Sequence, residues 1–303
     1  MIVYRNEPLD YESIFETIVN VTSDYVKKCG LKTMVLGLSG GLDSTVCAAI
    51  CKQVSKKTGV QLIGVSLPCS TNKEDENISA DLAGIEFCDR YMKKSIQDAF
   101  ECVSDMCNVA SHADATNISR GNIKARLRMI ALYDIASRER GIVVDTDNLT
   151  EHFLGFFTIN GDVGDLNPIG NLWKTEVYGL AEYMYKEVYK DSSALKAAIE
   201  IIPTDGNGVS NSDLDQIMPG YTYYEVDSIL KPWITLDSRI KEDFLKNGFG
   251  QKGTIFSTLV EKYGEDNVRR VILRCVGSEF KRMPHPIPID VFRGEVVKNY
   301  TIE

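Results

Sequence analysis

The sequence has few of the residues from which several common kinds of site are built. Only three histidines, His112, His152 and His285, are scattered along its 303 residues. A zinc site or a Ser-His-Asp triad therefore has little to draw on. Eight cysteines are present, but no Cys-x-x-Cys pair occurs among them. We expect reduced thiols that act as small hydrophobic side chains.

Basic charge and long apolar runs are also in short supply. The chain has 34 lysines and arginines against 43 acidic residues, a formal net charge of -9 and a pI near 5.1. This balance lacks the basic field that nucleic-acid binding usually requires. No apolar run approaches the length of a membrane span, and the first eight residues carry no signal-peptide core. We expect a cytoplasmic protein with neither a nucleic-acid nor a membrane partner.

The most informative segment is Ser39 to Ser44, which reads Ser-Gly-Gly-Leu-Asp-Ser. It follows the apolar run 34–38, which predicts a buried strand, and it opens an apolar stretch that predicts a helix. Glycines let the backbone approach an oxyanion, and a helix N-terminus offers unpaired N–H groups and partial positive charge. The junction therefore suits phosphate. The carboxylate of Asp43 fits there if it holds a divalent cation such as Mg²⁺ that bridges phosphates.

This loop matches neither of the two common nucleotide-binding templates. No lysine follows Gly41, as a Walker loop requires, and the glycines at 37, 40 and 41 do not fit a dinucleotide fingerprint. A Gly-Gly pair alone could be a simple chain reversal. The longer string resembles the pyrophosphate loop of ATP pyrophosphatases, which split ATP between the α and β phosphates. The resemblance implies adenylation of a substrate oxygen.

Strand and helix signals alternate along the first half of the chain. Strands are predicted at 34–38, 61–68 and 142–144, and helices at 10–29, from the polar loop 71–77 to about Tyr91, at 97–108 and at 122–138. The pattern is typical of an α/β fold with a parallel sheet and with ligands at the carboxyl ends of its strands. After Trp173 the pattern becomes helical. The turn-rich segment from Pro203 is too long for a tight connection and could be a mobile lid.

Further polar residues lie where this fold would bind a ligand. Asn122 and Arg126 are four positions apart and share a helix face, although a basic stripe of this kind is usually a solvated surface. Thr146 and Glu151 follow the strand 142–144 directly. A hydroxyl and a carboxylate are therefore expected at the carboxyl end of that strand.

Six sequence blocks, taken with the loop at 39–44, resemble ammonia-dependent NAD synthetase in order and spacing. They are Asn122 to Arg128, Thr146 to Asn148 with Glu151, Gly155 to Thr158, Gly161-Asp162, Pro168-Ile169 and Leu172 to Val177. The similarity runs from about residue 10 to Lys281-Arg282. It implies a Rossmann-like doubly wound parallel sheet of the adenine nucleotide alpha hydrolase type, with helices on both faces and a helical C-terminal part.

The resemblance also implies how one domain over 1–303 is organised. A helix would occupy about 1–30, a nucleotide-binding core about 31–180, and a helical part about 181–303 with the mobile loop at 203–219. The implied reaction joins ATP, deamido-NAD and ammonia: the nicotinate carboxylate attacks the α phosphate, pyrophosphate leaves, and ammonia displaces AMP to give NAD. The family is typically a homodimer.

Residue roles carry over from the family position by position. The resemblance assigns catalysis to Asp43, Glu151 and Lys174, with Asp43 and Glu151 as Mg²⁺ ligands and Lys174 offsetting charge on the departing pyrophosphate. ATP binding is assigned to Gly37, Ser39, Gly40, Gly41, Asp43, Ser44, Thr146, Lys174 and Thr204. Binding of deamido-NAD is assigned to Asn122, Arg126, Asp162, Asp165 and Lys281.

Three positions depart from the family pattern. Ile159 replaces a common lysine, Phe280 replaces a common histidine, and Asp145 replaces a common glycine. The first two changes affect contacts to the acyl acceptor and leave the ATP machinery intact. Two other hypotheses therefore stay open: a different adenylating amidotransferase or tRNA-modifying enzyme on the same loop, and a nucleotide-binding sensor without catalysis. About 30 residues precede the first strand, so free ammonia rather than an attached glutaminase is the expected nitrogen source.

Overall fold

A parallel four-stranded sheet lies at the centre of the computed structural model, which describes residues 8–70, 72–107, 116–161, 164–203, 214–215, 217–283, 289–290 and 295–296. Its strands are β1 (Thr33–Gly37), β2 (Gln61–Ser66), β3 (Arg90–Lys93) and β4 (Gly141–Val144), in the order β3-β2-β1-β4. In the register of the sheet, Val35 of β1 lies between Ile63 of β2 and Val143 of β4. The predicted parallel sheet is confirmed.

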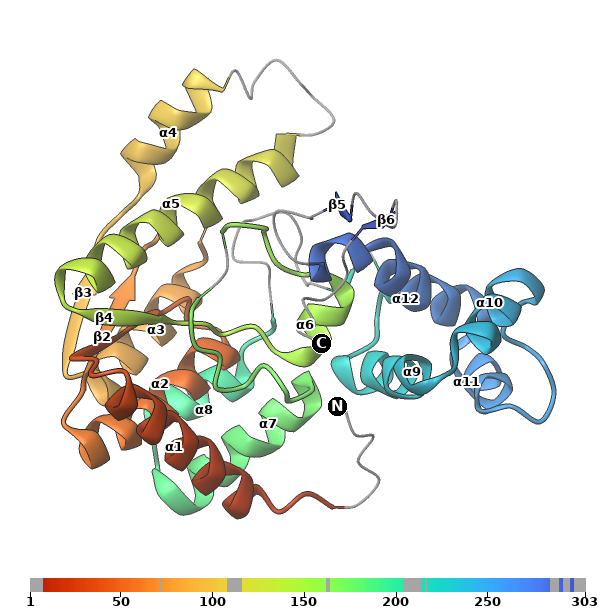
Figure 1. Ribbon diagram of the computed structural model, residues 1–303, viewed down its shortest axis with the longest axis horizontal. Coiled ribbons are helices and arrows are strands. Elements are labelled where there is room, and N and C mark those ends of the chain that lie inside the picture. Colours follow the sequence, from red (N-terminus) through yellow and green to blue (C-terminus); the bar gives the residue numbers. More distant parts are fainter. Residues whose placement is uncertain are drawn as a thin grey trace.

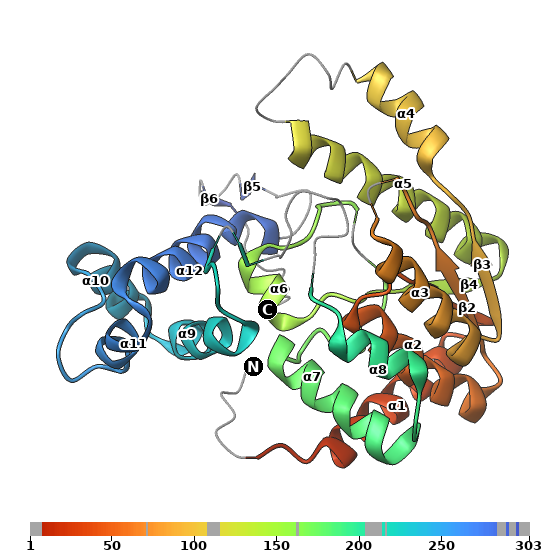
Figure 2. The same ribbon diagram turned by 180° about the vertical axis from the view of Figure 1, so that it is seen from behind.

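Helices cover both faces of this sheet, as Figures 1 and 2 show. One face packs on α4 (Gln97–Met106) and α5 (Thr116–Arg138). The other face packs on α2 (Leu42–Thr58) and α3 (Glu74–Phe87), and these helices are covered in turn by α1 (Tyr11–Lys28), α7 (Lys174–Tyr183) and α8 (Ser193–Glu200). Side chains alternate along each strand, so Val35 faces α5 while Met34 and Leu36 face α2. The doubly wound arrangement is therefore confirmed.

The C-terminal helices form a second apolar cluster beside the sheet (Figure 1). They are α9 (Tyr223–Thr235), α10 (Ser238–Asn247), α11 (Ile255–Tyr263) and α12 (Glu265–Gly277). The short α6 (Leu149–Leu154) packs with them, together with Trp173 at the start of α7. The remaining elements are the π-helix η2 (Met184–Val188), the 3₁₀ helix η3 (Glu279–Arg282) and the antiparallel pair β5 (Ile289–Asp290) and β6 (Glu295–Val296).

The helix that we expected to reach Tyr91 ends at Phe87, and Tyr91 belongs to β3. That prediction was wrong because β3 is an edge strand with charged residues at both ends and no buried position. Its four residues carry no apolar run to signal a strand. Helix α5 also starts earlier than expected, at Thr116.

Two further sequence expectations concern the expected lid and membrane-spanning segments. Of the expected lid at 203–219, residues 204–213 and 216 lie outside the described residues. Among the helices that the structure does describe, none is long and apolar enough to cross a membrane.

The strand order indicates where at the edge of the sheet a ligand would bind. The chain runs outward through β1, β2 and β3, and then returns to place β4 on the other side of β1. Open α/β sheets bind ligands at the carboxyl ends of the strands where the order reverses in this way. In this chain that point lies between the ends of β1 and β4.

Candidate functional site

A cavity of about 980 Å³ opens at the reversal point of the sheet. Its wall includes the glycine loop after β1, the segment after β4, and the starts of α6 and α7. Ten of the predicted site residues line it: Gly37, Ser39, Gly41, Asp43, Ser44, Asn122, Thr146, Glu151, Lys174 and Lys281. Residues more than 100 positions apart in the sequence are thus brought to one pocket.

The glycine loop is a strand-to-helix turn, and its polar groups form hydrogen bonds with one another. Gly41 is the N-cap of α2, and the Ser39 hydroxyl accepts a hydrogen bond from Gly41 N at 3.2 Å and lies 3.1 Å from the Ser44 hydroxyl. Gly40 has φ +85°, and a Cβ there would lie 2.0 Å from the carbonyl oxygen of Glu76 in α3. Gly40 does not line the cavity. Its role in this structure is to let the loop pass close to α3.

Three ionised side chains meet at the mouth of this loop. The Lys174 ammonium forms ion pairs with Asp43, at the start of α2, and with Glu151 in α6, where the Nζ to Oε1 distance is 3.1 Å. The Lys174 side chain is 3% exposed, and the two carboxylates are 14% and 15% exposed. A buried ammonium of this kind is stable because carboxylates compensate its lost hydration.

Local capping fixes the orientation of both carboxylates. Asn148 is the N-cap of α6: its side-chain oxygen accepts from Glu151 N at 3.0 Å, and Glu151 Oε2 accepts from Asn148 N at 3.1 Å. The same Asn148 side chain donates through Nδ2 to Asp43 Oδ1 at 2.9 Å. One asparagine therefore connects the two predicted metal ligands.

The donor set fits a hard divalent cation that also binds phosphate. The carboxylates of Asp43 and Glu151 already converge on one cationic group, the Lys174 ammonium. In the described part of the chain, no group of three or more His, Cys, Asp or Glu side chains could hold a metal by itself. Mg²⁺ commonly takes one or two carboxylates and completes its shell with water and substrate phosphates.

The residues predicted to bind the second substrate are spread more widely. Asn122 lines the large cavity and accepts a hydrogen bond from the Thr158 hydroxyl at 2.8 Å. Arg126 is exposed, does not line the cavity, and donates to the Ile159 carbonyl at 3.2 Å. Lys281 donates to the carbonyl oxygens of Gly155, at 2.7 Å, and Phe157.

Asp165 lies beside β4 and away from the cavity wall. Its carboxylate accepts from the Tyr133 hydroxyl at 2.9 Å and from Val143 N at 3.1 Å. Burial and this hydrogen bond to Asp165 together raise the pKa of Tyr133 to about 12. Asp162 and Thr204, also predicted as site residues, lie outside the described residues.

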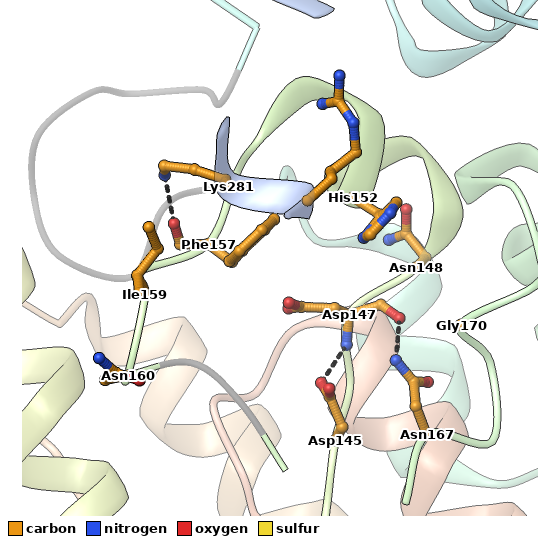
Figure 3. A pocket seen from close by; sticks show the side chains of 11 residues that line it. Asp145, Asp147, Asn148, His152, Phe157, Ile159, Asn160, Asn167, Gly170 and Lys281 are labelled. Atoms are coloured by element: carbon orange, nitrogen blue, oxygen red, sulfur yellow. Dashed lines mark hydrogen bonds between the residues drawn. The ribbon is translucent and has the colours of Figure 1, made fainter. Parts of the chain in front are cut away.

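A smaller cavity of about 260 Å³ adjoins the large one (Figure 3). Two positions that depart from the family pattern, Asp145 and Ile159, line it. Asp145 accepts from Asp147 N at 2.9 Å and so closes the turn after β4. His152 also lines this cavity, and burial together with the charge of Arg282 lowers its pKa. Figure 3 shows Asp145 and Asp147 across the cavity from Lys281.

An apolar wall of the large cavity was not predicted. It includes Leu67 after β2 and Met129 and Leu132 of α5. Arg128, which also lines the cavity, holds this wall in place, because it donates to the Leu67 carbonyl at 3.1 Å and to Asn72 Oδ1 at 3.2 Å. The position of Leu67 was predictable in part. It directly follows β2, which neighbours β1, so it lies at the same edge of the sheet as the glycine loop.

Comparisons with known proteins place this geometry in a family. The sequence matches the NAD synthase family over residues 14–284. It is 31% identical to an NH(3)-dependent NAD(+) synthetase of Helicobacter pylori, over 90% of this chain and 94% of that protein.

Two solved structures resemble the fold. An NMN synthetase of Francisella tularensis has a TM-score of 0.68 and 26% identity, over 93% of this chain and 99% of that one. An NH3-dependent NAD synthetase of Campylobacter jejuni has a TM-score of 0.59 and 25% identity, over 86% of this chain and 96% of that one.

Proposed function

The chain belongs to the NAD synthase family, and we propose that it amidates deamido-NAD with ammonia at the expense of ATP, giving NAD, AMP and pyrophosphate. One observation carries the proposal: Asp43, Glu151 and Lys174 converge at the mouth of the glycine loop, inside a cavity of about 980 Å³. Such a cavity is large enough for a nucleotide and a second substrate.

The proposed chemistry proceeds in two displacements. A carboxylate oxygen of the nicotinate attacks the α phosphorus of ATP, and pyrophosphate leaves. Ammonia then attacks the carbonyl carbon of the acyl adenylate, AMP leaves with the electrons of the broken C–O bond, and the nitrogen releases one proton to give the neutral amide. The first step needs in-line positioning of the carboxylate and neutralised phosphate charge, the second needs ammonia held against the carbonyl carbon, and neither needs a nucleophilic side chain.

The residues of this chain divide that work. The loop from Ser39 to Ser44 binds the β and γ phosphates at the start of α2, where the N–H groups favour anions. Lys174 offsets the charge that develops on the departing pyrophosphate. Asp43 and Glu151 would hold Mg²⁺, which, when bound, neutralises phosphate charge. Thr146, which lines the cavity, contacts ATP on the other side.

The acceptor would bind along Asn122 and Lys281. Arg126, Asp162 and Asp165 stay candidates from the sequence alone, because Arg126 and Asp165 do not line the cavity and Asp162 lies outside the described residues. Asn122 and Lys281 support this assignment because both line the large cavity. Phe280 is 53% exposed and also lines it, so the acceptor would meet an aromatic ring where many family members carry a histidine.

A product assay tests the proposal. Purified protein incubated with ATP, MgCl₂, ammonium chloride and deamido-NAD should release NAD and AMP in equal amounts. Release of ADP in place of AMP would contradict it. ATP binding with no AMP formed would instead favour a nucleotide-binding sensor.

A second acceptor is favoured by one comparison. The Francisella tularensis structure, with the higher of the two TM-scores given above, is an NMN synthetase, and Ile159 and Phe280 alter the predicted acceptor contacts of this chain. Nicotinate mononucleotide should therefore be offered in parallel with deamido-NAD. The ratio of the two kcat/KM values decides which acceptor the site prefers.

A homodimer is the proposed assembly. Val21 and Tyr25 of α1 and Ile130 of α5 are exposed by 63%, 41% and 59%. Exposed apolar side chains of this size are typical of protein contacts when they gather on one surface. Light scattering after gel filtration should give twice the 33.8 kDa mass of one chain, and a monomer would contradict the assembly.

A further inference from the structure

Asp227 is a buried carboxylate in the middle of an apolar helix. It lies in the second turn of α9, is 1% exposed, and has the buried residues Val226, Ile229 and Leu230 around it on the same helix. A buried carboxylate is costly unless hydrogen bonds satisfy its oxygens. Its partners therefore reveal why the position holds an acid.

Both oxygens of Asp227 bind residues at the starts of other helices. Oδ1 accepts from the Thr150 hydroxyl at 2.6 Å, and Oδ2 accepts from Thr175 N at 3.0 Å and from the Thr175 hydroxyl at 2.7 Å. Thr150 lies in α6 and Thr175 in α7. One side chain of α9 thus joins three helices.

These bonds replace the missing cap of α7. Its N-cap residue, Trp173, provides no side-chain cap, and the first N–H groups of a helix need partners from elsewhere. Lys174 N donates to the Thr150 hydroxyl at 2.9 Å, and Thr175 N donates to Asp227. The negative carboxylate also lies at the positive end of the helix dipole.

The residues held in this way adjoin the two predicted catalytic groups. Thr150 directly precedes Glu151, and Lys174 directly precedes Thr175. Burial raises the pKa of Asp227, whereas the hydrogen bonds from Thr150 and Thr175 and the charge of Lys231 act in the opposite direction. Because Asp227 is hydrogen-bonded to the neighbours of both groups, a displacement of its side chain would move the Lys174 ammonium and the Glu151 carboxylate together.

We propose that Asp227 is a positioning residue of the adenylation step. It fixes the starts of α6 and α7 so that Glu151 and Lys174 stay aligned with Asp43 on the glycine loop. This inference rests on the proposed function. Asp227 itself touches no substrate, since it does not line the cavity.

The decisive variant is Asp227→Asn, which keeps the size of the side chain but turns an acceptor into a donor facing Thr150 or Thr175. A misplacement of catalytic groups by about 1 Å can cost about 100-fold in rate. We expect kcat for AMP release to fall by a factor between about 10 and about 100, while KM for deamido-NAD changes less than about threefold. Thr175→Val, which removes one hydroxyl and keeps the backbone N–H, should lower kcat less.

Thr222→Ala is the matched control. It removes the N-cap of the same helix α9, where Thr222 accepts from Tyr224 N at 3.3 Å and donates to Glu225. It leaves all bonds to α6 and α7 in place. We expect it to lower the melting temperature without changing kcat of the folded protein.

A binding measurement separates this inference from the proposed function. Mn²⁺ titrated against protein and ATP, and followed by electron paramagnetic resonance, should bind several-fold more weakly to the Asp227→Asn protein than to the Thr222→Ala protein. The inference is overturned if Asp227→Asn and Thr175→Val both match Thr222→Ala in kcat per folded molecule and in Mn²⁺ affinity. If wild type forms no AMP, the proposed function fails, and the Mn²⁺ comparison still decides the role of Asp227.

Discussion

Lys174 occupies the place where two carboxylates of the site converge. Its ammonium offsets the repulsion between the Asp43 and Glu151 carboxylates, and the Lys174 side chain is buried. The same charge is in place to meet a phosphate, because all three residues line the cavity. In the proposed function this one cation offsets the charge of the two carboxylates and also that of the bound phosphates.

Lys174→Met should abolish most turnover. Loss of one preorganised charge that stabilises the transition state typically costs about 3–4 kcal/mol, or a factor of about 100 to 1,000 in kcat. The rate of AMP release at saturating substrates is the measurement. Lys186→Met is the control, because Lys186 pairs with Glu182 on an exposed helix surface. Activity of the Lys174 variant close to that of the control would refute the role.

Gly40→Ala should be far more damaging than another glycine substitution beside the same helix. A Cβ at Gly40 would meet a backbone oxygen of Glu76, whereas Gly59, the C-cap of α2, has φ +76° and nothing within 4 Å. Gly59→Ala reports the cost of positive φ alone, about 1 kcal/mol. Urea unfolding should show a larger loss for Gly40→Ala, with weaker ATP binding. Equal losses of unfolding free energy in the two variants would mean that the loop moves away from α3 at little cost.

Residues in contiguous motifs could be predicted from the sequence, and residues with distant partners could not. Asp43 and Glu151 each lie shortly after a strand, so the sheet edge brought them together as expected. Asp227 gave no signal, because its partners Thr150 and Thr175 lie 77 and 52 positions away. Its spacing from Tyr223 and Leu230 places it on the buried face of α9, but an aspartate is by residue type usually exposed to solvent.

At the scale of elements, buried strands were predictable and the edge strand was not. β1 and β4 are apolar runs whose residues are mostly buried, whereas β3 has no buried residue. The short α6 was also not predicted as a helix. It has six residues, too few for a helical period to be evident, and Asn148 and Gly155 cap it at its two ends.

The C-terminal end of α6 depends on a cation from α12. Arg274 donates through Nε to the Leu154 carbonyl at 2.7 Å and through Nη2 to the Gly155 carbonyl at 3.3 Å. Arg274→Met should lower the free energy of unfolding by about 1–3 kcal/mol, because the Leu154 carbonyl loses its donor, whereas the Gly155 carbonyl keeps Lys281. Arg269→Met, at an exposed position of the same helix, should change it by less than about 0.5 kcal/mol. Urea titrations give both values, and equal effects would exclude a capping role for Arg274.

At the scale of the whole molecule, α7 joins the two apolar clusters. Trp173 at its start belongs to the cluster of the C-terminal helices, while Val177 and Leu180 belong to the cluster that contains α2. The site lies where the clusters meet, since Asp43 comes from α2 and Glu151 from α6. The sequence predicted the change to a helical region but not that α6 would pack with the C-terminal helices, because contacts between distant segments leave no local pattern.

Because α7 belongs to both clusters, we expect the described parts of the chain to unfold in one transition. Both tryptophans, Trp173 and Trp233, lie in the second cluster, so their fluorescence reports that cluster while far-UV circular dichroism reports all helices. The two urea midpoints should agree within about 0.2 M, as two-state unfolding requires. MgATP at about 100 times its Kd should raise both by the equivalent of about 2.7 kcal/mol.

Single-tryptophan variants make this last test sharper. Trp233→Phe leaves a reporter at the junction with the first cluster, and Trp173→Phe leaves one among the aromatic rings of Phe249 and Phe256. If the clusters unfold together, each variant's fluorescence midpoint equals its own circular dichroism midpoint, with and without MgATP. A Trp233 signal that changes at lower urea than the circular dichroism would show that α9 to α12 separate first. In that case MgATP, which we propose binds mainly to the loop after β1, would shift the circular dichroism midpoint more than the Trp233 midpoint.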